Sequence, residues 1–309
     1  MRRKPRMMWI LYVFLMLTGF MLLPNTQDLQ VCSNPGDPVL GETAFELEED
    51  LSLGREDIEE QCFFKGVDLT IDADDHIYVL DKGHAKVRKF DARGNLVLSF
   101  GGLGQGPGEW LTPAGIRIDD LRKEVLVFDL SQLRFVIFDL DGTYLRTVTT
   151  RTAFHQWDIG AKGMIFAQTF SVSERGRTAD VVLFDLSTGE QKTIARYDYP
   201  LGRIINGAMI GTFSTLSHKL NLYRLGDNLG IYAHDSEYRL IVFDMEGNIV
   251  RIIEKDTAPE SISPDEKRKD IDHEIRLWKA RGIPLQPNEV RQAYPFPRNK
   301  PFFPGIGCR

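Results

Sequence analysis

The turn Phe138-Asp139-Leu140-Asp141-Gly142 occurs four times along the chain in similar form and decides the fold. The other copies, aligned on the aromatic residue and the aspartate, are Phe90-Asp91-Ala92-Arg93-Gly94, Phe184-Asp185-Leu186-Ser187-Thr188-Gly189 and Phe243-Asp244-Met245-Glu246-Gly247. The aspartates of successive copies are 48, 46 and 59 residues apart. A repeat of this length is typical of the four-stranded blades of a β-propeller.

A second apolar strand precedes most of these turns and ends in aspartate. Its copies are Ile77-Tyr78-Val79-Leu80-Asp81, Val125-Leu126-Val127-Phe128-Asp129 and Ile231-Tyr232-Ala233-His234-Asp235, whereas the third unit has Ile165-Phe166-Ala167-Gln168. Further upstream, Val67, Leu69 and Ile71 alternate with polar residues, as in a strand with one buried face. One such sheet cannot bury its apolar faces alone, but blades packed around an axis can. We therefore predict an all-β propeller of four-stranded blades over residues 41–255.

The repeat resembles a known family. The unit that runs from Asp129 through Arg134, Ile137, Phe138 and Asp139 to Gly142 resembles the NHL repeat, and it is echoed by Asp235 with Arg239 and by Asp81 with Lys86. The glycine-rich linker at 100–110, followed by Ile116-Arg117-Ile118-Asp119, is similar to the blade junction of bacterial six-bladed propellers of the NHL type. The resemblance covers residues 40–309 and implies a six-bladed fold in an exported protein.

The number of blades is smaller than the resemblance implies. Four complete units and the strand-like residues before Phe63 give about four to five blades. Six blades would need roughly 80 to 100 more residues at this repeat length. We therefore expect a truncated six-bladed propeller in which residues 291–309 begin a further blade. A ring of four or five blades is the alternative.

The N-terminal residues are typical of an export signal. Arg2, Arg3, Lys4 and Arg6 precede an uncharged run at 7–23. A basic segment followed by an apolar one predicts a signal peptide or signal anchor over residues 1–24, with a linker at 25–40. The remainder should lie outside the cytoplasm, in the periplasm or at the cell surface, and be associated with the membrane. A cleaved signal, a retained anchor and a lipoprotein modified at Cys32 are alternatives, as is a Cys32–Cys62 disulfide.

The C-terminal part departs from the repeat. Ser263-Pro264-Asp265-Glu266 forms a capping box with proline at the first helical position, and Gly282 is placed to end the helix. Ile271, Ile275 and Trp278 follow helical spacing, so this stripe should pack on the propeller. We predict a helical insertion at 256–290.

The sequence contains no recognisable catalytic or metal-binding motif. Its six histidines occupy positions that are not equivalent between the repeats: His76, His84, His155, His218, His234 and His273. The acidic patch at 72–75 fits a hairpin turn and lacks the complete spacing of a calcium loop. The formal net charge of −6 gives no basic surplus for binding nucleic acid. We therefore predict no catalytic residue, no metal ligand and no cofactor.

The junctions between blades hold the candidate binding residues. Glu109 and Trp110 lie in one junction, and His155, Gln156 and Trp157 lie in the next. An aromatic ring beside an acid or an imidazole suits a protein, peptide or glycan ligand, although both tryptophans could instead fill gaps between blades. We predict a non-catalytic recognition or scaffold module. The resemblance also allows a metal-dependent lyase, hydrolase or lactonase, and a truncated fragment without function is the third possibility.

Overall fold

The computed structural model describes residues 29–34, 46, 48–54, 58, 62–173, 176–199, 203–206, 208–210, 218–293 and 296–302. The predicted signal segment at 1–24 lies outside these residues. Among the described residues, no helix has both the length and the apolar character needed to cross a membrane.

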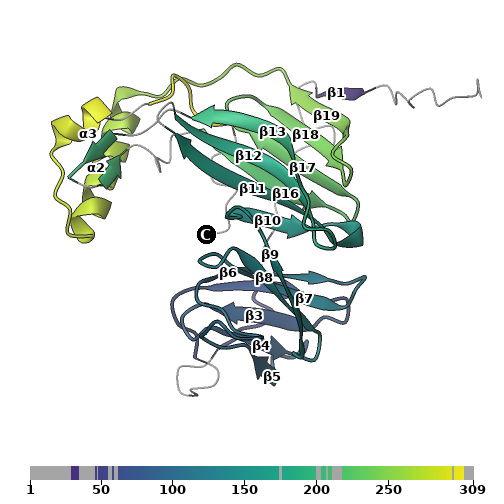
Figure 1. Cartoon of the computed structure of the whole chain (residues 1–309). Coiled ribbons are helices and arrows are strands. Elements are labelled where there is room, and N and C mark those ends of the chain that lie inside the picture. Colours follow the sequence, from purple (N-terminus) through teal and green to yellow (C-terminus); the bar gives the residue numbers. More distant parts are fainter. Residues whose placement is uncertain are drawn as a thin grey trace, which may run out of the picture.

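The described residues form four blades of four antiparallel strands, here called A to D (Figure 1). Blade A contains β2 (Val67–Ile71), β3 (Ile77–Asp81), β4 (Lys86–Phe90) and β5 (Leu96–Phe100). Blade B contains β6 (Pro113–Asp119), β7 (Glu124–Asp129), β8 (Arg134–Asp139) and β9 (Tyr144–Thr149). Blade C contains β10 (Gln156–Ile159), β11 (Met164–Ser173), β12 (Gly176–Asp185) and β13 (Gln191–Tyr199), with a 3-10 turn η2 (Ala161–Gly163). Blade D contains β16 (Leu220–Leu225), β17 (Leu229–His234), β18 (Arg239–Asp244) and β19 (Ile249–Lys255).

This arrangement confirms the predicted all-β propeller of four-stranded blades. The first strand of each blade contacts the first strand of the next, so β2, β6, β10 and β16 form the inner face of the array. The side chains that line this face come from residues far apart in the sequence.

The repeated turn folds through its aspartate. Asp139 Oδ1 accepts hydrogen bonds from the backbone N–H groups of Asp141 at 3.0 Å and Thr143 at 2.7 Å. Gly142 has a φ of +77°, a conformation that costs a residue with a side chain more than it costs glycine. Asp91 and Asp244 accept the corresponding backbone bonds in blades A and D, so the repeat has a common local cause.

The aromatic residue before each turn anchors the packing between blades. All four of these rings are at most 2% exposed, and they are Phe90, Phe138, Phe184 and Phe243. Apolar clusters fill the interfaces between A and B, B and C, and C and D. The equivalent burial of the four rings confirms the repeat alignment.

The basic residue of the repeat behaves differently from blade to blade. In blade B, Arg134 lies 3.7 Å from Asp129, as the motif suggests. In blade A, Asp81 pairs with Arg88 at 2.6 Å and not with Lys86, while Arg239 of blade D pairs with two glutamates. The basic residue of the motif therefore has a different partner in each of these blades, and its ion pair with the aspartate of the motif is seen in blade B.

A fifth strand lies within the segment predicted as a linker. Strand β1 (Gln30–Asn34) pairs in parallel with β19 at the outer edge of blade D (Figure 1). The prediction of a linker over 25–40 is therefore wrong for residues 30–34, because the free edge of β19 offers these residues backbone partners. Cys32 in this strand and Cys62 are free thiols, so they form no disulfide.

The helical part forms its own small cluster. Helix α2 (Pro264–Ala280) has the predicted capping box at Ser263 and is followed by α3 (Pro287–Ala293). The α2 stripe packs around Ile271 with residues of α3 and with Ile205 of the β14 (Arg203–Ile205) and β15 (Ala208–Ile210) hairpin. The expectation that this stripe packs on the blades is therefore wrong, because an inserted hairpin supplies the apolar partner.

The segment after α3 returns to blade D. The N–H of Phe302 donates to the backbone oxygen of Asp235 at 2.8 Å, and Lys300 donates to Glu260. Residues 296–302 contain no strand longer than a single bridge at Asn299. The further blade predicted at 291–309 is not seen in its described residues, and 303–309 lie outside them.

Candidate functional site

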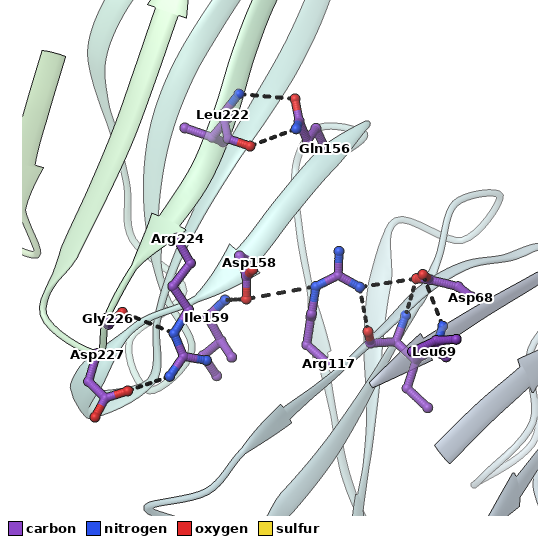
Figure 2. Close-up of polar contacts among 11 residues, drawn as sticks. Asp68, Leu69, Arg117, Gln156, Asp158, Ile159, Leu222, Arg224, Gly226 and Asp227 are labelled. Atoms are coloured by element: carbon purple, nitrogen blue, oxygen red, sulfur yellow. Dashed lines mark hydrogen bonds and ion pairs between the residues drawn. The ribbon is translucent and has the colours of Figure 1, made fainter. Parts of the chain in front are cut away.

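A line of charged side chains crosses the inner strands of three blades. Arg117 of β6 lies between Asp68 of β2, at 3.1 Å, and Asp158 of β10, at 3.7 Å (Figure 2). Asp68 also accepts a hydrogen bond from the N–H of Ile116 at 3.0 Å. One guanidinium therefore connects the inner strands of blades A, B and C.

The charges in this line are largely balanced by one another. Burial raises the pKa of Asp158 above its usual value, and the nearby charge of Arg117 opposes that rise. On the blade D side, Arg224 pairs with Asp227 and donates to the backbone oxygen of Gly226 (Figure 2). Because these groups already have partners, the line is better suited to holding the blades together than to binding a ligand.

Two glutamines of blade C bind the exposed edge of β16. The side-chain amide of Gln156 donates to the backbone oxygen of Leu222 at 2.6 Å and accepts from its N–H at 3.2 Å (Figure 2). Gln168 donates to the oxygen of Leu220 at 3.3 Å. These bonds satisfy backbone groups of β16 that no strand covers, and they fix the separation of blades C and D.

A cavity of about 280 Å³ opens between blades C and D next to these glutamines. Blade C reaches it because β11, β12 and β13 have nine or ten residues each, whereas the strands of blades A and B have five to seven. The lining residues belong to blade C and to the start of blade D. They are Gln156, Gln168, Phe170, Arg177, Tyr199, His218, Lys219, Leu220 and Asn221.

The cavity collects polar groups that have no hydrogen-bond partner. Of the six buried side-chain atoms without a partner in the described part of the chain, three belong to lining residues. These are Nε of Arg177, the hydroxyl of Tyr199 and Nδ2 of Asn221. Buried polar groups in folded proteins are nearly always hydrogen-bonded, so three such groups at one cavity point to a missing partner.

Aromatic rings fix the position of the charged group in this cavity. The guanidinium carbon of Arg177 lies 4.9 Å from the ring centre of Phe170 and 5.1 Å from that of Tyr199. The ring of Tyr199 in turn lies 5.5 Å from that of His234. A cation held against two rings loses little further freedom when it binds a ligand.

The family follows from the repeat region. A family model described as a 6-bladed beta-propeller matches residues 57–236, more than half of the chain. The chain belongs to this six-bladed propeller family. The described residues supply four of the blades that such a propeller contains.

Two bacterial proteins are among the known structures that resemble this propeller. A protein from Bacteroides fragilis NCTC 9343, provisionally described as exported, is 14% identical with a TM-score of 0.46. The alignment covers 78% of this chain and 64% of that structure, so the chain spans slightly less than two thirds of its length. A DUF4221 family member from Bacteroides vulgatus ATCC 8482 is 15% identical with a TM-score of 0.42, and the alignment covers 71% and 67% of the two chains. No curated protein sequence matches the chain.

Three of the five predicted site residues have structural roles in this propeller, namely Glu109, Trp110 and Trp157. Trp110 is 0% exposed in the core between blades A and B, and Trp157 is 4% exposed in the core between B and C. A Cβ on Gly101 would lie 2.1 Å from the Trp110 ring, which explains this glycine in the linker. Glu109 accepts the N–H of Gly106 at 2.9 Å and so closes the same glycine-rich loop. Both indoles are buried in the apolar clusters between neighbouring blades.

The other two predicted residues lie at the cavity. Gln156 lines it, and the ring of His155 packs in a T-shaped arrangement with that of Phe170, with the ring centres 4.9 Å apart. Burial and the charge of Arg177 lower the pKa of His155, so its imidazole is neutral near pH 7. The junction between blades B and C is therefore placed at the cavity, and the junction between A and B is not.

The acidic patch at 72–75 forms the predicted turn. Asp72 Oδ1 accepts the backbone N–H groups of Asp74 and His76, both at 2.9 Å. Possible ligand atoms of these three residues lie within 4.8 Å of one another, and they are the one such group among the described residues. Since the carboxylate of Asp72 is occupied by the turn and by Tyr78, the local structure has a sufficient cause without an ion.

Sequence analysis missed Phe170, Arg177, Tyr199 and Asn221. The one signal for them was the departure of the third unit from the repeat, where the apolar run ends in Gln168 and not in aspartate. The strands of blade C continue beyond that point, and Phe170, Arg177 and Tyr199 lie on the added length.

Proposed function

We propose that this chain is an exported, membrane-associated propeller of the NHL type that recognises a protein, peptide or glycan ligand without catalysing a reaction. The ligand binds in the cavity between blades C and D. The observation that carries this proposal is the group of three unpartnered buried atoms at one cavity, on Arg177, Tyr199 and Asn221.

The size of the cavity limits what enters it. A volume of about 280 Å³ lies at the lower end of the range for small-molecule sites, so it suits one amino-acid residue or one sugar ring. The rest of a longer ligand would then extend over the inner face. Recognition of one terminal or side-chain group of a larger partner fits these dimensions.

The lining favours binding over catalysis. Its titratable groups are Arg177, Tyr199, His218 and Lys219, and Nε2 of His218 lies 3.1 Å from the backbone oxygen of Asn299, to which it can donate. Hydrolysis needs a base within hydrogen-bond reach of a nucleophile or a metal-bound water. The described lining residues provide neither arrangement.

The export part of the proposal is supported by the sequence alone. The basic residues from Arg2 to Arg6 precede the apolar run at 7–23. This order is typical of an export signal, which supports a location outside the cytoplasm for the residues that follow it. Alkaline phosphatase fused after residue 60 should be active, and full activity of a reporter that works only in the cytoplasm would contradict the assignment.

The binding part is tested by closing the cavity. The full-length protein in detergent is titrated with fluorescent peptides and with labelled oligosaccharides. The substitution Asn221→Trp puts a large side chain into the cavity. It should abolish the binding of each probe that the wild-type protein binds. Glu190→Trp, on the exposed outer turn of blade C, is the matched control and should bind normally.

Two results would contradict this function. Unchanged binding by a folded Asn221→Trp variant would place the ligand elsewhere. A stoichiometric divalent metal in the purified protein, with turnover that chelation abolishes, would favour the metal-dependent enzyme.

A further inference from the structure

We propose that the group entering the cavity is a peptide carboxylate, bound by Arg177 with Tyr199 and Asn221 as additional donors. This inference rests on the proposed function, because it specifies the chemistry of the ligand at the same cavity.

The unpartnered atoms of the cavity are all able to donate. Nε of Arg177 and Nδ2 of Asn221 carry hydrogen and cannot accept. Burial raises the pKa of Tyr199, and the backbone N–H of Leu220 opposes that rise in part, so the hydroxyl stays protonated and its hydrogen has no acceptor among the described residues. A ligand group that only accepts hydrogen bonds satisfies all three, and an ionised carboxylate is such a group.

The charge of the cavity points the same way. Arg177 forms no ion pair with any described residue, whereas Arg196 on the adjacent strand pairs with Asp180 at 2.7 Å. Burial lowers the pKa of Arg177, which shows that its environment disfavours the charge. A half-buried cation without a counter-charge is costly, and an anionic ligand would remove that cost.

The other charged groups nearby do not neutralise Arg177. Asp235, next to the cavity, accepts the backbone N–H of Lys219 at 2.6 Å, and the charge of Lys219 also acts on this carboxyl group. Burial raises the pKa of Asp235 to about 6, and among the described residues this carboxyl group forms no ion pair with Arg177. Arg177 therefore keeps an unopposed charge on the cavity wall.

The orientation of Arg177 suits a carboxylate. Its guanidinium carbon lies over the rings of Phe170 and Tyr199, and its Nε has no hydrogen-bond partner among the described residues. An arginine edge binds a carboxylate through two parallel N–H···O bonds. The two rings provide apolar surface for the carbon atoms next to that carboxylate.

Peptides fit this donor-rich wall better than glycans. Each sugar hydroxyl both donates and accepts, so a sugar ring would need several acceptors in the cavity. The amide oxygen of Gln156 is already used by Leu222. A peptide end presents two carboxylate oxygens and one side chain, which matches the donors and the volume.

The experiment uses the full-length protein in detergent and measures fluorescence anisotropy. The probes are N-terminally labelled tripeptides that end in each amino acid, with a free C-terminal carboxylate or as the C-terminal amide. Labelled peptides with an internal glutamate and an amidated end, together with glucuronate and glucose as competitors, distinguish the sources of the carboxylate.

Free-carboxylate peptides should bind at least tenfold more tightly than their amides. Arg177→Gln should remove this difference, Arg177→Lys should restore part of it, and Tyr199→Phe should weaken binding about three- to tenfold. Arg196→Gln, an exposed arginine on β13, is the matched control and should leave binding unchanged. Far-UV spectra and melting temperatures establish that each variant is folded.

Equal affinity for acids and amides, or an Arg177→Gln variant that still discriminates between them, would overturn the carboxylate proposal. If Asn221→Trp abolishes that same binding, the proposed function stands while its ligand chemistry is wrong. Competition by glucuronate with no peptide bound would overturn the peptide assignment. The absence of binding by every probe would also overturn it.

Discussion

Blades B and C have the same strand order but end their second strands differently. In blade B, β7 ends at Asp129, whose carboxylate accepts the backbone N–H groups of Leu111 at 3.1 Å and Thr112 at 3.0 Å. In blade C, the matching register position is Thr169, because Ile165 pairs with Phe184 as Val125 pairs with Phe138. Strand β11 then continues to Ser173.

The difference explains where a cavity can form. The buried aspartate of blade B binds the segment that leads into β6 and closes that end of the blade. Threonine cannot accept several N–H groups at once with the strength of a carboxylate, and the strands of blade C continue beyond this position. In this molecule, the candidate site occurs where the repeat loses its closing residue.

The largest expected effect is a difference in stability between a substitution in the core of blade B and one at the cavity of blade C. Phe138→Ala removes a ring that is 2% exposed and contacts Phe100 and Trp110, and it should cost about 3 to 5 kcal/mol of unfolding free energy. Phe170→Ala should cost about 1 kcal/mol or less but weaken ligand binding, because its half-buried ring faces the cavity. Urea denaturation and peptide binding on both variants test this. Similar stability losses would show that blade C is closed like blade B.

The closing aspartate should have the next largest effect. Asp129→Ala leaves the backbone N–H groups of Leu111 and Thr112 without their acceptor in a fully buried position and removes the carboxylate 3.7 Å from Arg134, so it should cost about 3 kcal/mol. Thr169→Ala should cost about 1 kcal/mol. The midpoints of urea unfolding compare the two. A larger loss in Thr169→Ala would mean that threonine closes blade C after all.

The charged line should have a smaller effect than either. Arg117→Met removes the guanidinium shared by Asp68 and Asp158 and should cost about 1 kcal/mol, because all three side chains are partly exposed to solvent. The pKa of Asp158, already raised by burial, should rise further without its cation. Carboxyl chemical shifts measured during a pH titration report this. A lowered pKa in the variant would contradict the arrangement.

The smallest effect concerns pH and blade D. Burial and the charge of His218 lower the pKa of His234 from 6.5 to about 4. Between these two pH values the unfolded state takes up the proton and the folded state does not. The folded protein therefore loses stability as the pH falls from 6.5 to about 4. Burial raises the pKa of Asp235 from 3.8 to about 6, and its contribution is lost as the pH rises through that window.

These two contributions of blade D oppose each other between about pH 4 and 6. His234→Phe removes the first and keeps a ring against Tyr197, with which His234 stacks at 4.7 Å. The variant should therefore lose less stability than the wild type between pH 6.5 and 4. Melting temperatures at both pH values measure this, and an equal loss in the two proteins would argue against a buried neutral imidazole.

The repeat could be predicted from the sequence because its causes are local. Phe138, Asp139 and Gly142 are neighbours in the chain, and each has the same task in every copy. The capping box at Ser263 is local in the same sense, and it was predicted correctly. The sequence pattern was enough to predict the structure wherever a residue and its hydrogen-bond partner lie within one turn of the chain.

The site could not be predicted in the same way. Arg177 and Tyr199 lie on strand length that has no counterpart in the other units, and Asn221 joins them only when blades C and D pack. Trp110 and Trp157 carry the same sequence signal whether an indole faces a ligand or fills a gap. The interface between blades decides which of these occurs, and sequence spacing does not describe it.

Strand β1 gives blade D an unusual place in the folding order. Its pairing joins Gln30 to Arg251, so the outermost strand of this sheet is made before the other four strands of blade D. A contact across 221 residues has a large loop-closure entropy and raises the contact order of the chain. Blades A to C can each assemble from one continuous stretch as it is synthesised. Blade D is completed last, and until then the edge of β19 stays available to other chains.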